Sequence, residues 1–203
     1  RKIASDGTVT TLAGSASTGL VDGDAQTARF NYPVAIAIFK GTGDAVVADR
    51  NNHAIRRVTV NGIVTTVAGA AQNGYVDGKG SLARFYYPEG IDVDANGQIY
   101  VADRSNHCIR RIDIDGTVTT LAGKNIAGFA DSTSDLARFN SPTGVAVDGN
   151  GTVFVTDQGN YRVRAVLPDG SVSTVAGSAS AGYVDGFGAD ALFNALEDIS
   201  LSP

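Results

Sequence analysis

Residues 99–123 read Ile-Tyr-Val-Ala-Asp-Arg-Ser-Asn-His-Cys-Ile-Arg-Arg-Ile-Asp-Ile-Asp-Gly-Thr-Val-Thr-Thr-Leu-Ala-Gly, and this stretch decides the fold. It holds three short strand-like segments, separated by an Asp-x-x-Asn-His turn and an Asp-Gly turn. Asp-Gly and Asn-Gly pairs between such segments are typical of β-hairpins, because the backbone there adopts positive φ. The stretch therefore predicts three consecutive antiparallel strands.

The same passage recurs along the whole chain. Copies occupy residues 45–69 and 152–177, and residues 1–14 repeat its second half. The turn glycine recurs at intervals of 55, 54 and 54 residues, at Gly7, Gly62, Gly116 and Gly170. No linker or change of composition interrupts this series, so we expect one array within one domain.

Each unit also carries a short alternating segment ahead of this passage, at residues 36–39, 91–94, 145–148 and 199–201. Four antiparallel strands repeated about every 54 residues are typical of β-propeller blades. We therefore expect an all-β fold with full blades at about 30–69, 85–123 and 139–177. Partial blades are expected at 1–14 and 193–203, as in a piece of a longer ring.

The strand order predicts which connections share a face. Because the four strands alternate in direction, the inter-blade loops and the Asp-x-x-Asn-His turns should lie together on one face, and the Asn-Gly hairpins on the other. The Ala-Arg-Phe segments that precede each blade suit a single helical turn. We expect little other helix.

The composition argues against several classes of protein. The chain has 16 Lys and Arg against 21 Asp and Glu, whereas nucleic-acid-binding domains normally carry a basic excess. No apolar run approaches the roughly 20 residues that a membrane-spanning helix needs, so we expect no membrane insertion. Cys108 is the single cysteine, which rules out an internal disulfide framework.

Two kinds of motif resemble the signature of the NHL-repeat family. They are Asn-His-x-Ile-Arg-Arg at residues 52–57 and 106–111, and Phe-x-x-Pro-x-Gly at 85–90 and 139–144. The resemblance covers essentially the whole chain and implies a closed propeller, usually of six blades. It also implies a binding platform, often secreted or at cell surfaces, although some members bind RNA and one branch is a metal-dependent lyase. The departures from the pattern are Tyr161, Ala165, Ala35, Asp198 and Leu196.

The residues that every blade shares are interpreted as structural. His53 and His107 occupy the same turn position in successive blades, and the third copy is Tyr161, so they do not converge on one metal as zinc ligands must. The Asp that ends the second strand should accept hydrogen bonds from the backbone of its own turn. The Asn three residues later suits a left-handed backbone. These positions are Asp49, Asp103 and Asp157, and Asn52, Asn106 and Asn160.

The repeated charges are interpreted in the same way. The paired arginines 56/57 and 110/111 should point to opposite faces of their strand and, with Arg29, Arg84 and Arg138, offer cations to the repeated acids. One Asp in each inter-blade loop, at Asp22, Asp77, Asp131 and Asp185, does not supply the six or more oxygens that calcium needs. Turn chemistry is the expected role of these acids, and no metal or cofactor is expected.

Departures from the repeat are the candidate binding residues. Tyr86 and Tyr87 stand where other copies have mostly Asn, Ser or Ala, and tyrosine and arginine are enriched in binding hot spots; packing between blades is the alternative role of these tyrosines. Asp92 lies on the innermost strand and is expected near the central channel. Asn150-Gly151-Thr152 is a glycosylation sequon in a hairpin on the opposite face. The candidate binding residues are Tyr86, Tyr87, Glu89, Asp92, Arg50, Arg104 and Gln158.

These patterns predict a non-catalytic interaction or scaffold module that presents its loop face to a protein or a glycan. We expect it outside the cell or at the cell surface, within a multi-domain chain or larger assembly. One alternative is a propeller enzyme of the lyase or lactonase type with a metal in the central channel. A second alternative is RNA binding on the loop face.

Overall fold

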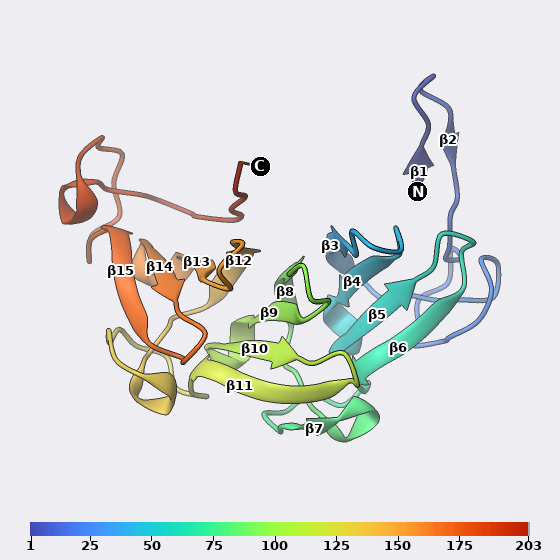
Figure 1. Ribbon diagram of the computed structural model, residues 1–203, viewed down its shortest axis with the longest axis horizontal. Helices are drawn as coiled ribbons and strands as arrows, with labels where there is room; N and C mark the ends of the chain where they lie inside the picture. Colours follow the sequence, from blue (N-terminus) through green and yellow to red (C-terminus); the bar gives the residue numbers. More distant parts are fainter. Residues whose placement is uncertain (203) are drawn as a thin grey trace.

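The computed structural model describes residues 1–202, and three antiparallel sheets are arranged in it as blades along an arc (Figure 1). Each blade has four main strands, and the middle sheet carries a fifth, short strand at its outer edge. In each blade the strands lie in sequence order, so every neighbouring pair is joined by a turn. Strands β3, β8 and β12 line the concave side of the arc, and β6, β11 and β15 lie toward its outside. This is the β-propeller architecture that the repeat predicts.

The first blade contains β3 (Pro33–Ile38), β4 (Ala45–Asp49), β5 (Ala54–Val58) and β6 (Val64–Gly69). The second contains β8 (Pro88–Val93), β9 (Ile99–Asp103), β10 (Cys108–Ile112) and β11 (Thr117–Gly123), and the third contains β12 (Pro142–Val147), β13 (Val153–Asp157), β14 (Arg162–Val166) and β15 (Val172–Gly177).

The outer edge of each blade is partly covered by the loop that enters it. Strand β7 (Gly78–Lys79) pairs with Thr117 and Val118 at the edge of β11. Isolated bridges do the same elsewhere, joining Gly23 to Val64 and Thr133 to Ser171. Covering an edge in this way removes unpaired backbone groups that would otherwise promote aggregation.

Apolar side chains from adjacent blades interlock to form the core. Val46, Ala48 and Ile55 of the first blade pack with Phe85, Ile91 and Val101 of the second, and an equivalent cluster joins the second and third blades. On the first blade, Ile36 and Ile38 of β3 occupy the positions of Ile91 and Val93 and are exposed. Burial between blades therefore drives the stacking of the repeats.

Helix is confined to three-residue 3-10 turns among the described residues: η1 (Arg50–Asn52), η2 (Gly80–Leu82), η3 (Arg104–Asn106), η4 (Ser134–Leu136), η5 (Gln158–Asn160) and η6 (Gly188–Asp190). The turns η2 and η4 end just before Ala83 and Ala137, which are extended. The helical turn predicted at Ala-Arg-Phe is therefore displaced toward the N-terminus. Within residues 1–202, no helix has the length and hydropathy to cross a membrane.

Residues near the two ends differ in their pairing. Strands β1 (Lys2–Ile3) and β2 (Val9–Thr10) form a separate two-stranded hairpin, as the repeat predicts for residues 1–14. The strand predicted at 199–201 is wrong, because these residues have no ladder partner and are irregular. Both ends lie at the open side of the arc (Figure 1).

Candidate functional site

A buried arginine ties the entering loop of each blade to its sheet. In the second blade, Arg110 donates through Nη1 to the Asp103 carboxylate at 2.7 Å and through Nη2 to Asp77 at 2.7 Å. The same nitrogens donate to the carbonyls of Arg84 and Val76. The guanidinium also lies over the ring of Phe85, at 5.0 Å. Arg56 and Arg164 repeat these bonds in the other blades.

A local irregularity of the sheet lies beside this arginine. A register shift occurs immediately before Arg56, Arg110 and Arg164 in the pairing of the third and fourth strands. The extra residue of each bulge lies on the fourth strand, at Val67, Leu121 or Val175. All three arginines are fully buried. The next residue, Arg57 or Arg111, is half-buried, which confirms that each pair faces opposite sides.

The acids serve different partners from those predicted. Asp103 accepts from the backbone N–H of Tyr86 in the entering loop, at 2.8 Å, and from the side chain of Asn106; it does not cap its own turn. Asp77 accepts from the backbone and hydroxyl of Thr120 as well as from Arg110. The local-turn interpretation of both acids is wrong, because they connect segments more than 15 residues apart. Burial raises the pKa of Asp103 to about 6, against the effect of Arg110 and the other donors.

The loop arginines also differ from the prediction. Arg84 donates to the carbonyls of Ser81 and Ala83, and Arg138 donates to those of Asp135 and Ala137. They therefore close their own turns and do not neutralise the repeated acids.

The histidines join adjacent blades. His53 Nδ1 accepts from the backbone N–H of Tyr87 at 3.2 Å, and His107 Nδ1 accepts from that of Ser141 at 3.0 Å. The left-handed residue of each turn is the histidine, with φ of 51° and 52°, and not the preceding asparagine. The prediction for Asn52 and Asn106 is corrected accordingly: their side chains bridge the Asp to a loop carbonyl.

Five polar side chains form a row across the loop face of the three blades, and we call this row the rim belt. Glu89 Oε2 lies 3.1 Å from Arg104 Nε and 4.0 Å from Arg50 Nε. Arg104 donates to Gln158 Oε1 at 3.1 Å, and Gln158 in turn donates to Glu197 at 2.9 Å. The rim belt therefore comprises Arg50, Glu89, Arg104, Gln158 and Glu197.

Aromatic side chains flank the Arg50 end of the rim belt. The Arg50 guanidinium lies over the ring of Tyr87 at 4.7 Å and that of Tyr32 at 5.6 Å. The rings of Tyr86 and Tyr87 are 5.0 Å apart, and His53 contacts both. Tyr32 is 62% exposed, so part of this cluster is open to solvent.

The structure thus brings six of the seven candidate binding residues together: Arg50, Tyr86, Tyr87, Glu89, Arg104 and Gln158. Two further residues of this surface were not identified from the sequence, Tyr32 beside Arg50 and Glu197 at the end of the rim belt. Glu197 stands in the register of Glu89, two repeats later, and this spacing is the signal that could have identified it.

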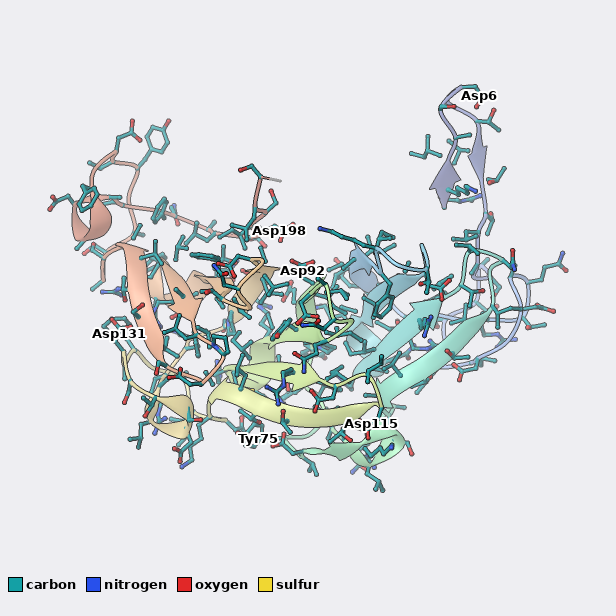
Figure 2. All side chains as sticks on the ribbon, viewed as in Figure 1. Asp6, Tyr75, Asp92, Asp115, Asp131 and Asp198 are labelled. Carbon is teal, nitrogen blue, oxygen red and sulfur yellow. The ribbon has the colours of Figure 1, made fainter. Side chains whose placement is uncertain are left out.

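Asp92 lies apart from the rim belt, near the concave edge of the arc, whereas Tyr75, Asp115 and Asp131 lie toward the outside (Figure 2). Its Oδ2 accepts from the backbone N–H of Val147 on β12, at 2.8 Å. The side chain therefore bridges two innermost strands. Asn150 is exposed in the β12–β13 turn, on the face opposite the rim belt. Within residues 1–202, no group of three His, Cys, Asp or Glu side chains is placed to hold a metal ion.

The repeated sheets and their buried Arg–Asp ties define a β-propeller repeat protein. The family model of the NHL repeat matches residues 30–58, 85–112 and 139–170, which hold the first three strands of each full blade. The chain therefore belongs to the NHL-repeat family, as its Asn-His-x-Ile-Arg-Arg motifs predict.

Two relatives of this chain are much longer proteins. The chain is 38% identical over 152 residues to NHL repeat-containing protein 2 of Gallus gallus. It is 32% identical over 151 residues to the protein SUPPRESSOR OF QUENCHING 1, chloroplastic, of Arabidopsis thaliana. These matches cover 68% and 70% of this chain, but only 20% and 14% of the relatives' own lengths.

Solved structures show the same fold at low identity. An auxiliary nutrient binding protein from Bacteroides ovatus superposes with a TM-score of 0.65 at 21% identity, covering 85% of this chain and 43% of that one. A gluconolactonase from Xanthomonas campestris superposes with a TM-score of 0.54 at 19% identity, covering 72% and 48%. The fold is therefore shared by binding proteins and enzymes alike.

Proposed function

We propose that this propeller is a protein-binding module and that the rim belt, with Tyr32 and Tyr87, is its contact surface. The observation that carries the proposal is the Arg50 guanidinium against the rings of Tyr32 and Tyr87. Arginine and tyrosine are enriched among the residues that dominate the energy of interfaces. Tyrosine buries a large area at low cost in conformational entropy, and arginine offers several donors in a fixed fork.

The charge pattern supports a protein partner. Arg50 and Arg104 are balanced along the rim belt by Glu89 and Glu197, and alternating charges suit the mixed charges of a protein surface. A nucleic-acid backbone would favour a net basic groove with stacking platforms. Within residues 1–202, Arg50 makes no side-chain hydrogen bond. Its Nε is buried beside Glu89, so its terminal nitrogens are the groups that can meet an acidic side chain of a partner.

The neighbouring network holds this surface in place. Asp103 fixes the backbone of Tyr86 at 2.8 Å, and His53 fixes that of Tyr87 at 3.2 Å. Both bonds come from groups in turns on rigid strands, so the two tyrosines are positioned before a partner arrives. Such preorganisation reduces the entropy lost on binding. The extracellular or cell-surface location stays a prediction.

A photocrosslinking experiment tests the proposal. Benzoylphenylalanine replaces Tyr32 in the full protein, and a control protein carries it at Ile114, which is 86% exposed on the opposite face. The captured partner is then purified, and its affinity is measured for Arg50→Ala, Tyr87→Ala and the outer-edge control Lys79→Ala.

We expect crosslinks only from position 32, with affinity about tenfold or more weaker for Arg50→Ala and Tyr87→Ala and unchanged within about twofold for Lys79→Ala. Equal capture from position 114, or a partner that binds Arg50→Ala as tightly as the parent, would overturn the proposal. If the protein instead binds a glycan and Arg50→Ala abolishes that binding, the partner of this surface is a glycan and the proposal of a protein partner is wrong.

A further inference from the structure

A polar pocket of about 270 Å³ lies on the face opposite the rim belt. Its walls are the β8–β9 turn at Asp94–Gln98 and the β12–β13 turn at Asp148–Gly151, so it spans the junction of the second and third blades. Leu121 and Pro168 supply an apolar side. Its size is near the lower limit of small-molecule sites, which suits one ring-sized ligand.

The pocket contains both acceptors and donors. Asp94 and Asp148 each use Oδ1 to accept from the backbone of their own turn. The buried Tyr100 hydroxyl lies 3.3 Å from both Asp94 Oδ2 and Gln98 Oε1. Asp148 Oδ2 has no hydrogen-bond partner within residues 1–202, and so the second oxygen of this carboxylate is free to accept.

Arg111 is the cation of the pocket. Its Nε lies 3.2 Å from Asp113 Oδ1, and Gln98 donates to the same oxygen at 2.9 Å. The terminal nitrogens of Arg111 make no hydrogen bond within residues 1–202, and its side chain is 31% exposed. The guanidinium is therefore anchored at one edge and offers its remaining donors to the pocket.

The preceding blade junction provides an internal comparison. There Phe39 replaces Asp94, Val46 replaces Tyr100 and Asp44 replaces Gln98. Arg57, the counterpart of Arg111, lies over Phe39 at 5.2 Å and donates twice to Asp44, at 2.9 and 2.6 Å. The free donors and acceptors of the pocket are thus a departure from the repeat, and the stacking of the blades does not require them.

We infer that this pocket binds a neutral, polyhydroxylated ring the size of a monosaccharide. A hydroxyl group both donates and accepts, so adjacent hydroxyls can bond a carboxylate and Arg111 together. A simple anion would be repelled by Asp94, Asp113 and Asp148. A simple cation offers no acceptor to the free N–H donors of Arg111. The apolar side at Leu121 and Pro168 suits the C–H face of a sugar ring.

Saturation-transfer NMR on the full protein tests the inference. The probes are the methyl glycosides of glucose, galactose and mannose, with glucuronate and glucosamine as charged comparators. The variants are Arg111→Ala and Tyr100→Phe, both with precedent in the third blade, where Ala165 and Phe154 occupy these positions. The matched control is Arg57→Ala, the equivalent arginine one blade earlier.

We expect at least one neutral glycoside to bind more tightly than either charged comparator. Arg111→Ala should weaken binding about tenfold, and Tyr100→Phe by a smaller factor, because a lost hydrogen bond to a charged group costs more than one to a neutral group. Arg57→Ala should change affinity by less than about twofold. Absence of transfer to every neutral glycoside, tighter binding of a charged comparator, or unchanged binding by Arg111→Ala would overturn the inference.

Discussion

His107 Nδ1 accepts a hydrogen bond from the backbone N–H of Ser141, which belongs to the next blade. His53 does the same for Tyr87 one repeat earlier, and both histidines hold a left-handed backbone. Acceptance requires an unprotonated Nδ1. The link between blades therefore exists only while the imidazole is neutral, so proton uptake is coupled to blade stacking.

We predict that the stability of the protein depends on these histidines in mildly acidic solution. Burial lowers the pKa of His53 and His107 below the usual 6.5, and the nearby Arg50 and Arg104 add to this effect. Above pH 6.5 both folded and unfolded states are neutral, and the stability is fully present. As the pH falls below that value, the unfolded chain binds protons first, so the free energy of unfolding decreases.

The measurement is urea denaturation at about pH 7.5 and about pH 5.5. The comparison protein carries His53→Tyr and His107→Tyr, since Tyr161 holds the same left-handed turn in the third blade, with φ of 56°. Asp103, whose pKa burial raises to about 6, contributes with the opposite sign in both proteins and cancels in the difference. An equal pH dependence in the two proteins would contradict the prediction.

The two arginines of one pair should differ sharply in their importance. Arg110→Met leaves the buried Asp103 without its cation and frees the carbonyls of Arg84 and Val76. Breaking a buried ion pair on one side costs about 3–5 kcal/mol. Arg111→Ala removes a half-exposed side chain, and its expected cost is below about 1 kcal/mol. Urea denaturation of both variants tests this, and similar losses would show that Asp103 does not depend on Arg110.

The sequence predicts the blades well because their determinants are local and repeated. The strand expected from Ile99 to Ala102 is observed from Ile99 to Asp103, and the turn glycines Gly97 and Gly116 have positive φ as expected. The arginine pairs were expected to offer cations to the repeated acids, as Arg110 does to Asp103 from the neighbouring strand. The bond between Asp103 and Tyr86 could not be predicted, because Tyr86 reaches this carboxylate only after the entering loop folds back onto the sheet. The general tolerance of asparagine for a left-handed backbone predicted this conformation at Asn106. The left-handed residue is instead His107, and the Asn106 side chain donates to Asp103 and to the Gly74 carbonyl.

The sequence could predict on which face of the propeller the candidate site lies, but not which side chains contact each other there. Departures from the repeat pointed to Glu89, Tyr87 and the turn arginines, and the strand order placed them on one face. The stacking of Arg50 on two rings depends on side-chain directions that no spacing fixes. The pocket beside Arg111 was not predicted, because it arises from the absence of an aromatic ring that fills the equivalent place beside Arg57.

Two glycines with similar positive φ should respond differently to alanine. Gly97 has φ of 83° and open space where a Cβ would lie, whereas Gly123 has φ of 90° and its Cβ would lie 2.7 Å from the His107 carbonyl oxygen and 2.9 Å from the Cys108 Cα. Gly97→Ala should cost about 1–2 kcal/mol from backbone strain alone. Gly123→Ala should cost about 2 kcal/mol more, because backbone atoms must move. Thermal and urea unfolding measure the difference, and equal costs would refute the steric argument.

Asp92 provides the last prediction, because its side chain joins two innermost strands where the first blade has only Ala37. Asp92→Ala removes the acceptor of the Val147 N–H and should cost about 1 kcal/mol, the usual net value of one hydrogen bond. Asp92→Asn keeps a carbonyl oxygen in place and should lose less. Hydrogen exchange at the Val147 amide should therefore accelerate in the alanine variant and change little in the asparagine variant. Unchanged exchange in both variants would mean that Asp92 does not hold the blades together, and would return it to the candidates for binding in the channel.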